Sequence, residues 1–582
     1  MRIFSLWIAG LVILAGCTAP PVPVPTTSTP TPLPVVTIAA ISATQLAASP
    51  PVTVTPVATQ LAESLPDTAA LFHDDRLTYE AGFYGAQIQA LLETHPGPLK
   101  DVVAYVGDRR YPFAEALVGP AVYYGVNPKL VLAIFDQQAG LLSDANATSD
   151  NLAWAAGYRG DTGNRRGLQA QTRWLIKELF FARRDYPARA SLRFADDNEQ
   201  PPPADVTLAE YMLLRVLAPT TTADRVVGLR ERVVARYTAL FEDPRQPPIV
   251  EPLASEPFLS RPLRRVEVTT SFFDHSGPFL MRDARAGVLT YWGRVETDPS
   301  FAYNGHDGWD YAADGVRALA AAPGVVAFAG NADDGCATRA VIVDHENGYR
   351  SLYWHLNRVD VVSGQRVSRD EWLGVLGNSG CSTGPHLHFG VQYRGRTVDP
   401  YGWCGAQPDP WAQRAGGAVS VWLWEDRPSP CAPPPAGYTI VDLGDSGYTQ
   451  TGDDWQQTAT GYGGNAAFVR SRARGTGRPP WDLAQPPTAT WRAPDLPGGR
   501  YEVLVYIPYA LSGLPESPAL RYRVRHAGGE EIVVVDAMRF ANEWASLGIY
   551  QINGGQAQVR IDAGTRSAGL TVWADAVAWR TR

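Results

Sequence analysis

Histidine is rare in this chain, and its placement restricts how the middle of the chain can fold. Five of the nine histidines lie between residues 306 and 388, at His306, His345, His355, His386 and His388. Two of them stand two residues apart in the apolar, strand-like stretch TGPHLHFGV. Side chains alternate along a strand, so His386 and His388 should share one face while Leu387 and Phe389 point to a core. Two imidazoles on one face indicate a shared ligand rather than ordinary packing.

The stretch NGHDGWDYAA supplies two further donor groups, His306 and Asp310, separated by three residues. Zinc in a hydrolytic site takes three protein ligands and leaves one position for water. His306, Asp310 and one of the paired histidines complete such a set. In YRSLYWHLN, strand alternation predicts that His355 lies on the face of Tyr353 and Ser351. A cupin-like metal barrel also uses His-x-His, but the Glu that usually follows is absent from FGVQY.

Three motifs occur in a fixed order here: His-x-x-x-Asp, Tyr-x-His-Leu, and His-x-His within TGPHLHF, followed by VDPYGW. In this order they resemble the lysostaphin-type, or LytM-like, zinc endopeptidases, over roughly residues 266–403. The resemblance implies that His306, Asp310 and His388 bind one zinc ion. It also implies that His355 and His386 flank the reacting water and the oxyanion, and it leaves open which of them is the general base.

Two features differ from the pattern of that family. Gly390 follows Phe389 where family members commonly carry Glu, and the loop between Thr270 and Gly305 is unusually long. Neither difference removes a zinc ligand. Because loops around the groove set specificity in such enzymes, both differences bear on substrate contacts.

The cysteines indicate an oxidising compartment. Besides Cys17 there are four, at Cys336, Cys381, Cys404 and Cys431. An even number predicts two disulfides, and three connectivities are possible. We favour pairing of nearest neighbours, which would stiffen one wall of the groove through Cys336 and Cys381. Four thiolates around a structural zinc are the rival, but no Cys-x-x-Cys spacing supports it.

The first 66 residues read as an export signal and a tether. Residues 1–17, MRIFSLWIAGLVILAGC, combine a basic residue, a short apolar run and small residues before Cys17. The ending resembles the bacterial lipobox, which implies lipidation of Cys17; a short uncleaved anchor is the alternative. Residues 18–66 are rich in Pro and Thr with almost no charge, which predicts a disordered linker.

Residues 67–245 show helical periodicity, with apolar residues at spacings of three and four. Asn127 and Pro128 form a good helix start, with Asn as N-cap and Pro at the first helical position. The segment YGVNPKLVLAIFDQQAGL resembles the catalytic-helix region of lysozyme-like lytic transglycosylases. Gln138 stands where that family has its acid, and an amide has no proton to give. We therefore expect a degenerate lysozyme-like domain without glycosidase activity, or an unrelated helical spacer.

The last segment, residues 438–582, has about ten short strand-like runs separated by turn residues, which predicts a β-sandwich. Stretches such as GGRYEVLVYIPY and VWADAVAW resemble the golvesin C-terminal-like domain. Exposed aromatic rings can stack on sugars, so a wall-polysaccharide ligand is one interpretation, and burial of the rings in the core is the other. The tryptophans concerned are Trp455, Trp481, Trp491, Trp544, Trp573 and Trp579.

The sequence thus predicts a multidomain protein with an α-helical N-terminal module, a mainly antiparallel β peptidase domain over residues 263–431, and a C-terminal β-sandwich. We expect a lipid-anchored zinc metalloendopeptidase of the cell envelope, outside the cytoplasm, whose partners are peptidoglycan and the membrane. A non-catalytic wall-binding or regulatory lipoprotein is the alternative. The net charge of −8 argues against a broad nucleic-acid surface.

Overall fold

The computed structural model of the chain describes residues 71–582, apart from residues 79, 81, 107–108, 161–164, 248–255, 266, 278–286, 297–304, 415–416, 432–433, 435, 459–460, 474–485, 509–514, 541 and 566. The predicted signal segment, Cys17, the linker and Trp481 lie outside the described residues. Within the described part, no helix has both the length and the apolar character needed to cross a bilayer.

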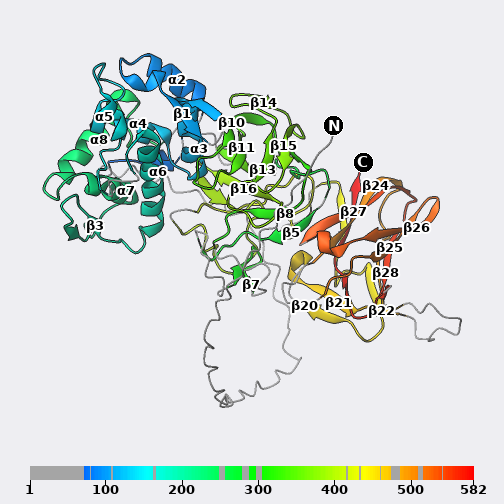
Figure 1. Cartoon of the computed structure of the whole chain (residues 1–582). Helices are drawn as coiled ribbons and strands as arrows, with labels where there is room; N and C mark the ends of the chain where they lie inside the picture. The colour runs from blue at the N-terminus through cyan, green and yellow to red at the C-terminus, as the bar shows by residue number, and fades with distance from the viewer. Residues whose placement is uncertain are drawn as a thin grey trace, which may run out of the picture. The chain divides into compact units, whose positions relative to one another are not determined.

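The N-terminal part of the described chain is helical, as the sequence predicts (Figure 1). Its α-helices are α1 (Asp75–Thr78), α2 (Gly85–Glu93), α3 (Phe113–Tyr123), α4 (Pro128–Ala139), α5 (Ser149–Ala153), α6 (Leu168–Asp185), α7 (Leu208–Leu217) and α8 (Val226–Leu240). Its short elements are the 3₁₀ turns η1 (Pro98–Asp101) and η2 (Ala218–Thr220), and the hairpins of β1 (Val103–Val106) with β2 (Arg109–Pro112) and β3 (Leu192–Arg193) with β4 (Glu199–Gln200).

Helix α4 begins and ends where its sequence predicts. The Asn127 side chain accepts a hydrogen bond from the Lys129 backbone at 2.9 Å, and Pro128 occupies the first helical position. The helix stops at Gly140, whose φ of 66° is left-handed. Gln138 lies in the last turn, and its Nε2 donates to Thr220 Oγ1 at 2.9 Å.

The central domain consists of short strands. They are β5 (Val268–Ser271), β6 (Val288–Leu289), β7 (Val295–Glu296), β8 (Trp309–Ala312), β9 (Arg317–Leu319), β10 (Gly324–Asn331), β11 (Arg339–Asp344), β12 (Tyr349–Trp354), β13 (Leu356–Val359), β14 (Arg366–Val367), β15 (Trp372–Leu376), β16 (Leu387–Tyr393) and β17 (Arg396–Val398). Most of them form one antiparallel sheet in the order β14-β10-β11-β12-β16-β8-β5, with β17 also paired to β16. A second sheet has the order β13-β15-β9.

A hairpin at Asn347-Gly348 joins β11 to β12, and its turn is longer than the two residues that such a pair commonly forms. The backbone of His345 donates to the Tyr349 carbonyl at 2.9 Å, so three residues form the turn. Glu346 and Gly348 both have positive φ there, at 59° and 87°. The glycine thus marks a three-residue turn with two left-handed positions.

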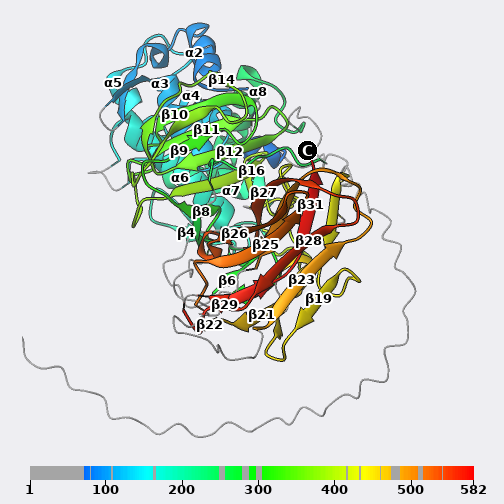
Figure 2. The same cartoon turned by 90° about the vertical axis from the view of Figure 1, so that its right-hand side faces the viewer.

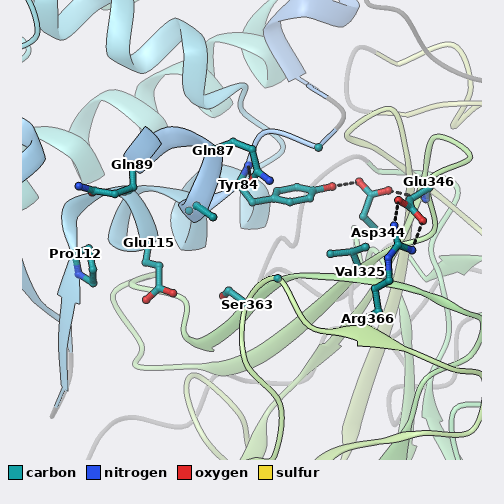
Figure 3. Close-up of a pocket in the computed structure, with 15 residues that line it drawn as sticks. Tyr84, Gln87, Gln89, Pro112, Glu115, Val325, Asp344, Glu346, Ser363 and Arg366 are labelled. Atoms are coloured by element: carbon teal, nitrogen blue, oxygen red, sulfur yellow. Dashed lines mark hydrogen bonds and ion pairs between the residues drawn. The ribbon is translucent and has the colours of Figure 1, made fainter. Parts of the chain in front are cut away.

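Two cores meet where the helical part packs against the central sheet. Phe328 of β10 and Trp354 of β12 belong to the buried cluster of the helices, while Phe389 and Tyr353 belong to the core on the other face of the sheet. A cavity of about 690 Å³ lies at this junction. Figure 3 shows Tyr84 extending from the start of α2 to hydrogen-bond Asp344 across it.

The C-terminal domain is the expected β-sandwich. Its strands are β18 (Tyr438–Val441), β19 (Tyr448–Thr451), β20 (Gln456–Thr458), β21 (Ala466–Arg470), β22 (Arg472–Ala473), β23 (Thr488–Ala493), β24 (Gly499–Ile507), β25 (Leu520–His526), β26 (Gly529–Val535), β27 (Glu543–Ile552), β28 (Ala557–Asp562), β29 (Gly564–Thr565), β30 (Thr571–Ala574) and β31 (Val577–Thr581), with 3₁₀ turns η3 (Tyr462–Gly464) and η4 (Ala537–Arg539). The sheet β18-β31-β24-β27 and the sheet β19-β23-β28-β25-β26 share one buried core (Figure 2).

The tryptophans of this domain are mostly core residues. Trp491, Trp573 and Trp579 are no more than 1% exposed, and Trp544 is 3% exposed. Trp455 packs partly buried against the same core. The described indoles therefore stabilise the sandwich, and the interpretation of them as a sugar-stacking surface loses its main support.

A buried carboxylate connects the sandwich to the central domain. Glu543 of β27 is 2% exposed and pairs with Arg261 at 2.8 Å, with Arg427, and with the Tyr401 hydroxyl. Within the central domain, Cys404 and Cys431 form a disulfide between the segments that carry Tyr401 and Arg427, and Cys336 bonds to Cys381. Both are the nearest-neighbour pairs that the sequence favours.

Candidate metal centre

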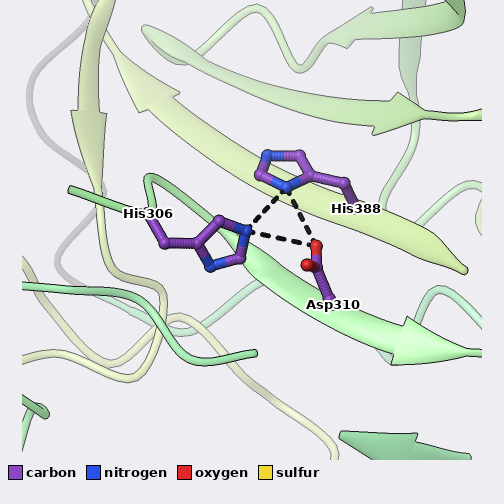
Figure 4. Close-up of side chains that lie close together, drawn as sticks. All are labelled: His306, Asp310 and His388. Carbon is purple, nitrogen blue, oxygen red and sulfur yellow. Dashed lines mark hydrogen bonds and ion pairs between the residues drawn. The ribbon is translucent and has the colours of Figure 1, made fainter. Parts of the chain in front are cut away.

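Strand register brings three predicted metal ligands together. In the pairing of β16 with β8, His388 lies directly opposite Asp310, and His306 reaches the same point from the segment before β8. His388 Nδ1 lies 3.0 Å from Asp310 Oδ1 and 3.0 Å from His306 Nε2, and the third distance is 3.2 Å (Figure 4). All three residues are buried, and together they could hold a metal ion.

The backbone around His306 fixes the orientation of its ring. Nδ1 lies 2.8 Å from the Phe272 carbonyl oxygen, which only accepts, so this nitrogen carries a proton. In the neutral ring Nε2 therefore points a lone pair at Asp310 and His388. Burial alone would lower the pKa of His306, but the Asp310 carboxylate raises it to about 9. Burial would raise the pKa of Asp310, yet His306 and His388 hold it well below its ordinary value, so this carboxylate is ionised.

These contacts fit a cation better than they fit hydrogen bonds alone. Three donor atoms lie 3.0–3.2 Å apart in a triangle. One proton on His388 Nδ1 cannot point along two sides of that triangle at once. Ligands about 2.0–2.1 Å from a tetrahedral zinc would lie roughly 3.3 Å apart, close to the observed spacing. Two imidazoles and one carboxylate are also a donor set that zinc accepts.

Gly308 leaves space for the His388 ring. A Cβ atom built at Gly308 would lie 2.6 Å from His388 Nε2 and 2.8 Å from the Phe389 carbonyl oxygen. Any side chain at this position would therefore displace the ring or the strand. The close approach of His388 thus explains sterically why a glycine stands between His306 and Asp310.

His355 and His386 lie beside this group. Their ring centroids are 4.5 Å apart, and His386 Nε2 is 3.5 Å from Asp310 Oδ1. His386 Nδ1 lies 2.8 Å from the Gly384 carbonyl oxygen, and His355 Nδ1 lies 2.7 Å from that of Ser379. In the neutral form of either ring, the proton therefore sits on Nδ1 and Nε2 is unprotonated.

The prediction that His355 lies on the face of Tyr353 and Ser351 was wrong. The histidine does lie near His386, as the family resemblance implies. Strand β12 ends at Trp354, and His355 has a left-handed φ of 65°. Tyr353 packs on Phe389 in the core behind the sheet, whereas the His355 ring faces His386. The backbone reversal, which alternation cannot predict, thus turns His355 away from the face of Tyr353 and Ser351. Burial, with a smaller effect of His388, lowers the pKa of His355 to about 4.

An aromatic stack contacts the metal-binding group from the helical side. The Trp354 ring lies 4.5 Å from the His388 ring at 14°, and Tyr123 of α3 lies 4.3 Å from Trp354 at 16°. These near-parallel rings restrict the rotation of His388. Sequence reasoning gave no role to Tyr123 or Trp354, because no motif joins them.

A second buried histidine site, at His275, was not predicted from the sequence. His275 is fully buried, with Nε2 3.0 Å from Asp399 and Nδ1 2.8 Å from Asp409. Burial would lower its pKa, but hydrogen bonds to the two carboxylates raise it to about 9. Asp399 also accepts from Trp309 Nε1 at 2.9 Å. Because Trp309 immediately precedes Asp310 in β8, the His275 cluster anchors the start of the strand that carries this ligand.

The fold and this group of residues define a metallopeptidase domain. Residues 304–400 match the family model of peptidase family M23, residues 70–255 that of the LasA N-terminal domain, and residues 439–581 that of the golvesin C-terminal domain. The central domain is therefore an M23 metallo-endopeptidase domain, and zinc is its cofactor. The lysozyme-like interpretation of the helical part stays a prediction.

Three similar proteins show how far this likeness extends. Protease LasA of Pseudomonas aeruginosa is 26% identical over 350 residues, which cover 58% of this chain and 77% of LasA. Peptidoglycan DD-endopeptidase ShyA of Vibrio cholerae is 39% identical over 95 residues, which cover 16% of this chain and 22% of ShyA. The crystal structure of a zinc containing peptidase from Vibrio cholerae is 28% identical, with coverage of 26% and 39% and a TM-score of 0.18.

Proposed function

We propose that this protein is an exported, lipid-anchored zinc endopeptidase that hydrolyses cross-bridges or stem peptides of bacterial peptidoglycan. The observation that carries the proposal is the five-residue arrangement in which His355 and His386 flank the group of His306, Asp310 and His388. A purely structural metal site needs only its ligands, so two further imidazoles beside the ligands indicate a catalytic site. Similarity to the peptidoglycan DD-endopeptidase ShyA supports peptidoglycan as the substrate.

The chain's own residues divide the chemistry. His306, Asp310 and His388 would hold zinc, which as a Lewis acid activates the scissile carbonyl and the attacking water. His355 and His386 present unprotonated Nε2 atoms, so either ring can accept the proton of the water and pass it to the leaving amine. The other ring can take a proton from solvent at Nε2 and then donate a hydrogen bond to the developing oxyanion. Their carbonyl partners, Ser379 and Gly384, keep both rings in this orientation.

The central test combines metal analysis with wall digestion. We expect the purified full-length chain to hold about one zinc ion and to release peptides from peptidoglycan, detected by liquid chromatography and mass spectrometry. A zinc chelator should stop the release, and added zinc should restore it. If the wild type holds no zinc, or releases no more peptide than the His355→Ala variant, the non-catalytic wall-binding alternative replaces this proposal.

The proposed anchor has its own test at Cys17. We expect the mature protein in cells to begin at a lipid-modified Cys17, to partition into the detergent phase, and to show the added acyl mass. The Cys17→Ala variant should lose that mass, because no thiol remains for the thioether bond. A wild-type chain that retains residues 1–16 in the membrane would contradict lipidation and favour the uncleaved anchor.

A further inference from the structure

Two adjoining cavities lie beside the catalytic histidines, on the side of the disulfide Cys336–Cys381. The larger is about 450 Å³ and the smaller about 170 Å³, and both are lined by Arg339 and Asn357. The helical part contributes Arg109 and Tyr111 of β2 to the smaller cavity. We call these two cavities together the arginine trough.

The larger cavity connects directly with the catalytic loops. Ser379 lines it and accepts the hydrogen bond of His355 Nδ1, and Gly377 lines it and forms a β-bridge with His386. Asn357 follows His355 by two residues. A peptide bound at the metal-binding group would therefore have the trough next to it.

The charge of the trough is positive at the end formed by both domains. Three arginines line the smaller cavity, and no acidic residue is among the described residues that line it. In the larger cavity Asp314 is the one acidic residue among the described lining residues, beside Arg339. Arg358 is neutralised by Asp360, at 2.6 and 2.9 Å. Arg339 donates from Nη1 to the Asn357 carbonyl at 2.7 Å and makes no ion pair with the described residues. Within the described part of the chain, Arg109 is exposed and makes no ion pair.

We propose that the arginine trough binds a free carboxylate of the peptide that is cleaved, and so selects substrates with a carboxylate near the scissile bond. Guanidinium groups bind carboxylates in a planar, two-pronged geometry that a carboxamide does not match. This inference rests on the proposed function, because it concerns the same substrate. It also gives the helical domain a part in substrate selection through Arg109.

A pair of chemically matched substrates tests this assignment. Soluble peptide fragments of peptidoglycan are prepared with free carboxylates and, in parallel, with those carboxylates converted to carboxamides. The wild type should cleave the carboxylate form with a kcat/KM about tenfold higher, mainly through a lower KM, as expected for a charged hydrogen bond. Arg339→Gln and Arg109→Gln should each lose most of that preference and change cleavage of the amidated form less than about twofold.

The control is Arg525→Gln, which removes the same charge from the exposed surface of β25 in the C-terminal domain. It should leave the preference intact, and all variants should keep the wild-type Tm. Equal losses on both substrate forms, or a wild type that does not distinguish them, would overturn the assignment.

A binding measurement separates this inference from the proposed function. If the wild type cleaves neither fragment, the proposed function fails, and binding of the same fragments to the His355→Ala protein then tests the trough alone. Tighter binding of the carboxylate form, lost in the Arg339→Gln background, would support the trough. Equal binding of both forms would reject it.

Discussion

Replacing His388 by alanine should empty the metal site and reduce peptide release at least about a thousandfold, because zinc would lose one of its three protein ligands. Replacing His386 should have a different effect. The three ligands stay in place in His386→Ala, so zinc should remain bound while the rate falls about 10²-fold to 10⁴-fold, as for loss of a general acid or base. Metal analysis of both purified variants, beside their initial rates, distinguishes the two cases.

The matched control for this pair is His345→Ala. His345 lies in the same domain, but its ring bonds the Pro323 carbonyl and Ser351 Oγ, both at 2.9 Å, rather than the metal-binding group. This variant should keep its zinc and most of its activity. Zinc retained in full by His388→Ala, or lost by His386→Ala, would reverse the assigned roles of the two neighbouring histidines.

Replacing His275 by alanine should destabilise the central domain by about 3–5 kcal/mol, the usual cost of breaking a buried ion pair. The variant leaves Asp399 and Asp409 buried without the cation between them. Chemical denaturation of the full chain, followed by Trp fluorescence, measures the loss. His345→Ala removes an equally large ring whose pKa burial lowers, and should cost only about 1–3 kcal/mol. A double variant, His275→Ala with Asp409→Asn, should recover part of the stability.

The same cluster predicts a pH dependence of stability. The pKa of His275 rises from an ordinary 6.5 to about 9 in the fold, so the folded state binds the proton more tightly than the unfolded chain. Its stabilising contribution is therefore complete below about pH 6.5 and is lost as the pH rises through about 9. The wild type should lose stability over this window more steeply than His275→Ala. Parallel curves for the two proteins would mean that His275 is neutral in the fold.

The sequence predicted the metal-binding group because each of its members belongs to a short motif. Alternation around Leu387 correctly separated the core residues from the histidines, and the glycine before Trp309 fits the close approach that the structure shows. His355 was placed on the wrong face because one residue with positive φ reverses the alternation. Such a reversal depends on packing around the strand end, which periodicity does not describe.

The contacts that the sequence could not predict join residues far apart in the chain. His275 meets Asp399 across more than a hundred residues, and Tyr123 meets Trp354 across two domains. Neither pair has a local spacing or composition that marks it. The tryptophans of the C-terminal domain illustrate the converse problem. A sequence shows that Trp579 is aromatic, but only the packed sandwich shows that it is buried.

The Glu543 contact restricts how the sandwich can move relative to the peptidase domain. Glu543 of the sandwich is buried with two arginines and a tyrosine of the preceding chain, and breaking such a contact is costly, so the connection between the two domains is rigid. The sandwich and the peptidase domain would therefore move as one rigid body. A surface bound by the sandwich would then fix the distance and the orientation of the metal centre relative to that surface. The enzyme would therefore cleave bonds at a set distance from the surface that the sandwich binds.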